Sequence, residues 1–312
     1  IRTDIVAGSS TVTMEQQEHI YDCLIVGAGP GGLQAAIYLG RYNRDVLLID
    51  RSGGRTWHEK HIENFLTQKD ISGSQIVRLG IEQAKSFNVK VRRGLVTKIL
   101  KPKDVFEVYT EEGVEKAQFV IVSSGVMDNL PEIENVHTYL GTSFFTCVDC
   151  DGYRCTGKKL LVIGNSIYTV RLAFAMKEMF TKDVTLLLCI YDPPEDYKEE
   201  LADQGIRLIK GRPLRIVGEG RLSGLELRDG SIIECDVIMS NFGFKLNNAF
   251  LSELPLKRDG KGFKYVTNHN FESSIGGLYI VGPLNTGHDQ VVIAAGEGAV
   301  AAIDIKSRLF TL

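Results

Sequence analysis

The chain has 312 residues, of which 44% are hydrophobic and 24% charged, and its net charge is −3. This length suits two domains of ordinary globular composition. Because the sequence has no dense run of Lys and Arg, we expect no nucleic-acid partner. The longest apolar runs, such as residues 184–191, are much shorter than the roughly 18 residues of a membrane-spanning helix. We therefore expect a soluble cytoplasmic protein, with peripheral membrane contact left open.

The six cysteines are too sparse for the disulfide framework of a small secreted protein. The beginning of the chain lacks the basic and apolar regions of a signal peptide. Residues 1–13 carry no periodicity and precede Met14, so we expect them to lie outside the fold.

The first part of the chain predicts a βαβ unit. An apolar run at residues 21–26 leads into glycines, residues 33–42 have the composition of a helix, and residues 45–49 form a second apolar run. This order is typical of a parallel sheet. The pattern then continues with a helix at 72–87, strands at 90–93, 96–100, 105–109 and 118–122, and a turn at 111–113.

The same pattern starts again further along the chain. Residues 159–163 run into Gly164 and are followed by an expected helix at 169–180 and a strand at 184–191. The last segment, residues 277–305, reads as a strand, a Gly-rich loop and a helix that return to the first domain. We therefore predict an α/β fold of two Rossmann-like, three-layer dinucleotide-binding domains. The first comprises residues 14–133 and 268–312, and the second, residues 134–267, is inserted into it.

A dinucleotide fingerprint follows the first predicted strand. The run Gly27-Ala28-Gly29-Pro30-Gly31-Gly32 fits G-x-G-x-x-G. In this pattern Gly27 makes the turn, Gly29 lets the backbone approach a pyrophosphate, and Gly32 allows close packing of helix on strand. Asp50 ends the next strand, where an acid binds a ribose hydroxyl. The alternative is a Gly-rich turn without a ligand.

A cysteine pair forms the second informative motif, Thr146-Cys147-Val148-Asp149-Cys150-Asp151. Two cysteines at this spacing can close a small disulfide ring, and a helix that begins beneath them stabilises a thiolate. Asp151 could supply or accept the proton that thiol chemistry requires. Half of a zinc site and a reduced structural pair remain alternatives, although we see no second pair of zinc ligands and expect no metal.

Both motifs, in this order, resemble the low-molecular-weight thioredoxin reductase family over residues 21 to about 306. The resemblance implies that Cys150 lies against the flavin of a bound FAD, that Cys147 exchanges with a partner disulfide, and that Asp151 is the acid–base group. It also implies a homodimer that acts on a thioredoxin-like protein or a small thiol. The residues expected at the FAD are Gly27, Gly29, Pro30, Gly31, Gly32, Asp50, Arg51, Gly54, Trp57, Asn64, Val96, Gly125, Gly282, Gln290 and Val291.

The second domain departs from the family pattern. Its glycine fingerprint is reduced to Gly164-Asn165-Ser166-Ile167-Tyr168-Thr169, and a side chain at Ser166 obstructs the approach to a pyrophosphate. Where the family has His-Arg-Arg for the 2′-phosphate, this chain has Leu188-Cys189-Ile190, which removes a charge-assisted contact. We therefore expect NADPH to be a poor donor.

Other departures concern the flavin. Gly282-Pro283 stands where the family has Gly-Asp, and Asp289 replaces an arginine beside Gln290. In the run Gly53-Gly54-Arg55-Thr56-Trp57-His58, together with the reduced second fingerprint, the chain looks most similar to a diflavin-linked disulfide oxidoreductase branch. This likeness leaves open a second FAD in the vacated nucleotide site, stacked on aromatic residues such as Tyr168, Phe174 and Tyr191. The alternatives are an NADPH-dependent or ferredoxin-dependent thioredoxin reductase, and a flavin-binding redox sensor without turnover.

Overall fold

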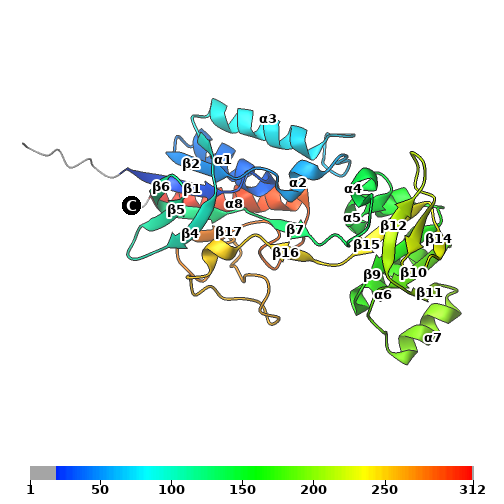
Figure 1. Cartoon of the computed structure of the whole chain (residues 1–312). Coiled ribbons are helices and arrows are strands. Elements are labelled where there is room, and N and C mark those ends of the chain that lie inside the picture. The colour runs from blue at the N-terminus through cyan, green and yellow to red at the C-terminus, as the bar shows by residue number, and fades with distance from the viewer. Residues whose placement is uncertain (1–18, 311–312) are drawn as a thin grey trace, which may run out of the picture.

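The computed structural model describes residues 19–310, which fold into two units joined by two chain crossings (Figure 1). The expectation about residues 1–13 lies outside the described part. The elements of the first unit and the crossings are β1 (Ile20–Val26), α1 (Pro30–Arg41), β2 (Val46–Asp50), α2 (Arg55–His58), α3 (Gly73–Ser86), β3 (Lys90–Arg93), β4 (Val96–Leu100), β5 (Phe106–Thr110), β6 (Gly113–Val122), β7 (Val126–Asp128), β16 (Phe244–Leu246), η2 (Ala249–Leu251), β17 (Leu278–Ile280) and α8 (Val291–Leu309).

The first unit has three layers. Strands β3, β2, β1 and β6 run parallel in that order, and β17 pairs in parallel with the end of β6. The first half of β6 instead pairs antiparallel with β5, which pairs with β4. The sheet therefore divides along β6 into a parallel layer and an antiparallel meander.

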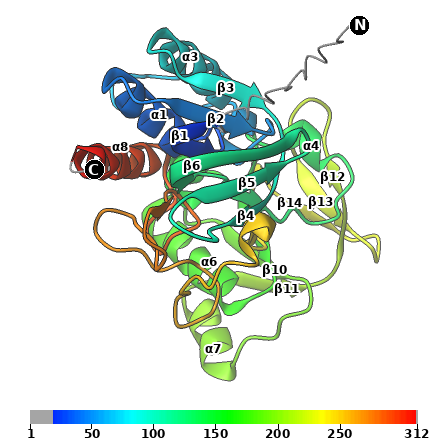
Figure 2. The same ribbon diagram turned by 90° about the vertical axis from the view of Figure 1, so that its left-hand side faces the viewer.

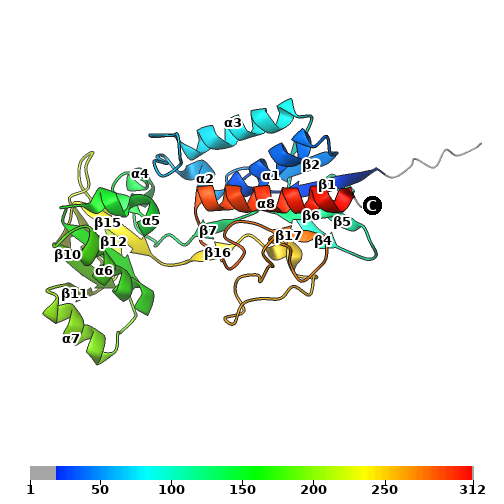
Figure 3. The same cartoon turned by 180° about the vertical axis from the view of Figure 1, so that it is seen from behind.

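Helices cover the face of the parallel sheet that lies away from the antiparallel meander. Helices α1, α3 and α8 pack there, with α8 running alongside α1 (Figure 3). Figure 2 shows the meander β4–β6 on the other side of the unit from α1 and α3. Local sequence sets the helix starts: Pro30 at the first helical turn is preorganised for α1, and Ser72 and Gln75 form a capping box on α3.

The second unit repeats the three layers. Its elements are α4 (Val136–Tyr139), β8 (Phe144–Phe145), α5 (Val148–Asp151), η1 (Gly152–Cys155), β9 (Leu160–Gly164), α6 (Ile167–Met179), β10 (Val184–Leu188), α7 (Glu195–Asp203), β11 (Arg207–Lys210), β12 (Pro213–Val217), β13 (Gly224–Leu227), β14 (Ile232–Glu234) and β15 (Val237–Asn241). A parallel sheet of order β11-β10-β9-β15-β8 has α6 and α7 on one face and the antiparallel β12–β14 on the other. The predicted fold class, two Rossmann-like units in one α/β chain, is confirmed.

The chain crosses between the units twice. Strands β7 and β16 pair antiparallel at this point, Phe244 opposite Asp128 and Leu246 opposite Val126. Beyond β16, Leu251 and Tyr265 are buried in the core that contains β4 and β5. The inserted domain expected at residues 134–267 thus ends in a stretch that packs on the first unit.

Several elements differ from the sequence expectations. Helix α1 begins at Pro30 rather than at residue 33, and β6 starts at Gly113 rather than at 118, because its first half pairs with β5. Strand β10 ends at Leu188, before the expected end at 191. Among the described residues, no helix combines the length and apolarity needed to cross a membrane, and no three potential metal ligands lie together.

The contact between α8 and α1 yields a stability prediction. A Cβ at Gly298 would lie 2.0 Å from the backbone oxygen of Gly31, so Gly298→Ala must push α8 away from α1. We expect a loss of about 1–3 kcal/mol in the free energy of unfolding, measured by urea denaturation. The matched control is Gly296→Ala on the same helix, where a Cβ meets nothing within 4 Å. This control should be neutral or stabilising by about 0.5–1 kcal/mol, and equal effects of the two substitutions would contradict the close packing.

Candidate functional site

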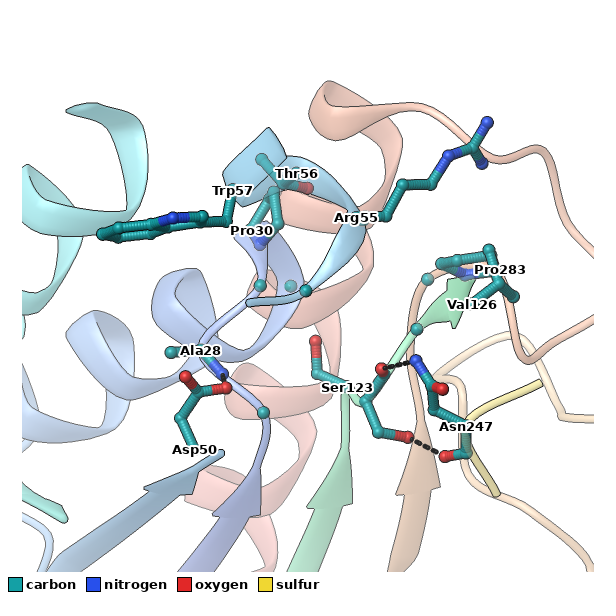
Figure 4. Close-up of a pocket in the computed structure, with 18 of the residues that line it drawn as sticks. Ala28, Pro30, Asp50, Arg55, Thr56, Trp57, Ser123, Val126, Asn247 and Pro283 are labelled. Carbon is teal, nitrogen blue, oxygen red and sulfur yellow. Dashed lines mark hydrogen bonds between the residues drawn. The ribbon is translucent and has the colours of Figure 1, made fainter. Parts of the chain in front are cut away.

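A cavity of about 510 Å³ opens at the carboxyl ends of β1, β2 and β6, where ligands bind in sheets of this type. Every residue expected at the cofactor lines this cavity except Gly32. Figure 4 shows Asp50 beside Ala28 at the strand ends, with Arg55 and Trp57 extending from α2 in opposite directions. The fold therefore brings residues that are scattered between positions 27 and 291 together at one cavity.

A side chain would be excluded for a different reason at each of the three fingerprint glycines. Gly27 has φ +103°, and a Cβ there would lie 2.5 Å from the backbone oxygen of Ser123. A Cβ at Gly32 would lie 2.0 Å from the oxygen of Gly27, which fits the expected close packing of helix and strand. At Gly29 the nearest atom would be 3.5 Å away, an ordinary contact. No protein atom therefore requires a glycine at position 29. A glycine there instead fits a pyrophosphate that lies close to the protein backbone.

Side chains around the fingerprint fix its loop. Asp50 accepts hydrogen bonds from the backbone amides of Ala28 (2.9 Å) and Ser52 (2.8 Å). The Ser123 hydroxyl accepts one from Gly32 N at 2.9 Å. A carboxylate has about four acceptor positions, so Asp50 retains capacity for a ribose hydroxyl.

The wall opposite the fingerprint comes from a distant part of the chain. Asn247, just beyond β16, donates to the backbone oxygen of Ser124 (3.0 Å), and the Ser124 hydroxyl donates to Asn247 O (2.6 Å). Arg51 donates to the Asn247 side chain at 3.3 Å. Asn247 could not be predicted as a lining residue, because no local pattern around it indicates a contact with a residue more than 120 positions away.

A disulfide joins Cys147 and Cys150 beside this cavity. Cys150 is the member of the pair that lines the cavity. Cys147 is the N-cap residue of α5, and its sulfur accepts the backbone N–H of Cys150 at 3.1 Å. Hydrogen bonding to a sulfur favours its thiolate form, so this arrangement suits a reducible pair.

Gln290 connects the disulfide to the first unit. Its Nε2 lies 3.9 Å from Cys147 Sγ and 3.7 Å from Cys150 Sγ. Its Oε1 accepts a hydrogen bond from Asn64 Nδ2 at 3.0 Å. Asn64 and Gln290, which were singled out separately in the sequence, are therefore hydrogen-bonded to each other, and Gln290 contacts the sulfurs.

Asp151, next to the disulfide, interacts electrostatically with other carboxyl groups. Burial raises the pKa of Asp151 to about 6; the charge of Arg154 opposes this rise, and Glu63 adds to it. Burial, followed by the charge of Asp151, also raises the pKa of Glu59 to about 6. A group with a pKa of about 6 can both release and take up a proton near neutral pH.

Two further ion pairs complete the site. Arg55 Nε lies 2.9 Å from Asp128 Oδ2, and burial raises the pKa of Asp128. Asp289, which stands where the family has an arginine, pairs with Lys264 at 2.8 Å. The sequence did not predict Arg55, Asp128 or Lys264 as site residues. Each of them depends on an ion pair with a residue in a different segment, which no local pattern indicates.

The family model named pyridine nucleotide-disulphide oxidoreductase matches residues 21–298, which is most of the chain. The chain belongs to this family. With the disulfide at the cavity, family membership makes the chain a flavin-dependent disulfide oxidoreductase of the thioredoxin reductase type.

The chain is also similar to individual proteins. Thioredoxin reductase of Aquifex aeolicus is 29% identical, over 95% of each chain. NADH dehydrogenase of Bacillus subtilis is 27% identical over 95% of this chain, which spans 60% of that protein. Among solved structures, HlmI has a TM-score of 0.87 at 27% identity and 94% coverage of each chain. Thioredoxin reductase from Streptococcus pyogenes has a TM-score of 0.86 at 24% identity, covering 94% of this chain and 99% of that one, which bears on the fold alone.

The open space at Gly29 leads to a binding prediction. Gly29→Ala should leave the stability of the FAD-free protein within about 0.5 kcal/mol of the original. It should weaken FAD binding about tenfold or more, as measured by flavin fluorescence, because the new methyl group occupies the pyrophosphate path. Unchanged FAD affinity would show that the fingerprint does not hold the pyrophosphate.

Proposed function

We propose that the chain exchanges electrons between an FAD held in the cavity and the Cys147–Cys150 disulfide, without a nicotinamide nucleotide as donor. The single observation that carries the proposal is the position of Cys150, which lines the same cavity as the fingerprint glycines. FAD supplies two-electron chemistry through its isoalloxazine ring. The pyrophosphate would be held at Gly29 and the N-terminus of α1, and the ribose at Asp50.

The chain's own residues account for the thiol chemistry. Cys150 is the sulfur proposed to face the flavin, and Cys147 is the sulfur proposed to exchange with the external thiol or disulfide. Asp151, buried next to the pair, is proposed to give and take the proton as the disulfide opens and closes. Gln290 is proposed to hold the two sulfurs in place through its amide.

Contacts at the second fingerprint support independence from NADPH. Asn165 Oδ1 accepts hydrogen bonds from the backbone amides of Ile190 (2.9 Å) and Tyr191 (2.7 Å), which follow β10. These amides are therefore already engaged where a nucleotide ribose would lie. Thr169, at the close-packing position, is fully buried, and its hydroxyl lies 3.4 Å from the Ser166 hydroxyl.

The charge at this site also differs from the family's. Leu188-Cys189-Ile190 stand in the positions of the family's His-Arg-Arg run. Burial raises the pKa of the Cys189 thiol, and the charge of Arg212, beyond β11, opposes this rise. A 2′-phosphate would therefore find no basic side chain at residues 188–190, where the family has two adjacent arginines. A site with these substitutions is expected to bind NADPH weakly.

A second FAD in the vacated site has less support. Phe174 stacks on Tyr197 with ring centres 6.5 Å apart, so that ring already has a partner. Tyr168 is 54% exposed, but its hydroxyl accepts a hydrogen bond from Lys261 at 3.0 Å. The proposal therefore takes one FAD as sufficient for exchange with Cys147–Cys150.

We also propose a redox partner and a homodimeric assembly. The external partner is a thiol or disulfide, either a thioredoxin-like protein or a small molecule. A homodimer is supported by Val292, Val300 and Ile303, exposed apolar side chains on one face of α8. The four other cysteines, Cys23, Cys155, Cys189 and Cys235, are free, as is usual in the reducing cytoplasm.

Anaerobic reduction tests the proposed electron route. NADPH should leave the flavin oxidised, or bleach it at least about 100-fold more slowly than dithiothreitol does at equal concentration. The reason is that dithiothreitol reaches the flavin through the disulfide, whereas NADPH has no intact site. Absorbance of the flavin is the measurement.

Variants identify the sulfur that carries the electrons. Cys150→Ser should abolish bleaching by dithiothreitol, and Cys235→Ser, which changes a buried thiol in the second unit, should not. Rapid bleaching by NADPH would refute nucleotide independence. Bleaching that survives in Cys150→Ser would refute the disulfide route.

A further inference from the structure

Arg154 lies immediately after the disulfide segment, in the turn η1, and its side chain is mostly buried at 22% exposure. Its Nη2 donates to Glu63 Oε2 at 2.6 Å. Its Nε lies 3.3 Å from Asp151 Oδ1, without the alignment of a hydrogen bond, so this second contact is a charge attraction. One guanidinium thus contacts two carboxylates.

The two carboxylates belong to different units. Glu63 lies in the loop between α2 and α3 of the first unit, whereas Asp151 and Arg154 belong to the second. Asn64, the next residue in that loop, holds Gln290 against both sulfurs. The loop of the first unit therefore contacts the disulfide segment on two sides, through Gln290 and through Arg154.

The groups that act on Asp151 come from two segments, η1 and the loop between α2 and α3. Arg154 and His61 favour its ionised form, and Glu63 opposes it. Glu59, beyond α2, also interacts with the Asp151 charge. Without Arg154, Asp151 would face the acids Glu59 and Glu63 with His61 as the remaining basic group that acts on it.

We propose that Arg154 is a positioning residue for thiol–disulfide exchange, which couples the proton on Asp151 to the loop of the first unit through Glu63. This inference rests on the proposed function, in which Asp151 is the acid–base group. An external thiolate attacks Cys147 Sγ, the sulfur–sulfur bond breaks, and Cys150 leaves with the electron pair. Cys150 takes the proton of the Asp151 carboxyl, and the products are a mixed disulfide on Cys147, a Cys150 thiol and an Asp151 carboxylate that Arg154 stabilises.

The proposal predicts opposite effects of two substitutions. Arg154 favours the carboxylate, so Arg154→Met should raise the pKa of Asp151. Glu63 disfavours the carboxylate and binds the guanidinium, so Glu63→Gln should lower that pKa. A role that was merely structural would not move the two variants in opposite directions.

The test measures reduction of the disulfide rather than turnover. The FAD-loaded protein is treated with dithiothreitol across the pH range, the freed thiols are trapped with iodoacetamide, and the product is counted by mass spectrometry. The rate constant for reduction of the disulfide is divided by the concentration of dithiothreitol thiolate. This value should fall as pH rises through the pKa of Asp151, about 6, because the step needs the protonated carboxyl. In Arg154→Met the midpoint should move to higher pH by about half a unit or more, and in Glu63→Gln to lower pH.

Controls separate the outcomes. Arg154→Lys keeps the charge and should lie between the original and Arg154→Met. Arg215→Met breaks an equally short pair with Glu226 on β12 and β13 and should leave the midpoint unchanged. Should Arg154→Met not fold, the midpoint shifts in Arg154→Lys and Glu63→Gln still test the proposed role of Arg154.

Asp151→Asn distinguishes this inference from the proposed function. If Asp151→Asn keeps the original pH profile, the acid–base role of Asp151 fails, and the role of Arg154 fails with it. If Asp151→Asn flattens the profile while Arg154→Met and Glu63→Gln leave the midpoint in place, the role of Arg154 alone is overturned.

Discussion

The amide of Gln290 lies against both sulfurs of the Cys147–Cys150 disulfide and is held in turn by Asn64. This contact joins the two units at the disulfide for which we propose the redox chemistry. Cys150 reaches the cavity of the first unit because the crossings at β7 and β16 bring the second unit alongside. The polar contacts of Arg55 with Asp128 and of Arg154 with Glu63 surround the same junction.

The second unit has the parallel sheet of a dinucleotide-binding domain, and we propose that it has lost the nucleotide site. Buried Thr169 and the hydrogen bonds of Asn165 occupy the fingerprint loop with protein atoms, and the parallel sheet beneath it remains intact. Core packing and ligand binding place separate demands on such a unit, so one can change without the other. In this account the second unit serves to carry the disulfide and Asp151.

The sequence predicted what local patterns encode. The fingerprint at Gly27 and the pair at Cys147 have fixed spacings, so their strands, loops and approximate positions could be read directly. Contacts between distant segments could not be predicted. Asn247 contacts Ser124, and Arg154 contacts Glu63, through tertiary packing that no local sequence pattern indicates. Strand β6 began earlier than expected for the same reason, because β5 pairs with its first half.

The central claim is the proximity of Cys150 to the flavin, and the Cys147→Ser variant tests it most directly. Removing Cys147 leaves the Cys150 sulfur as a free thiolate at the cavity, and a thiolate stacked against oxidised flavin gives a long-wavelength charge-transfer absorption. The account predicts that this band appears in Cys147→Ser loaded with FAD and disappears on acidification as the thiolate is protonated. A flavin spectrum without such a band at any pH at which the protein is folded would contradict the account.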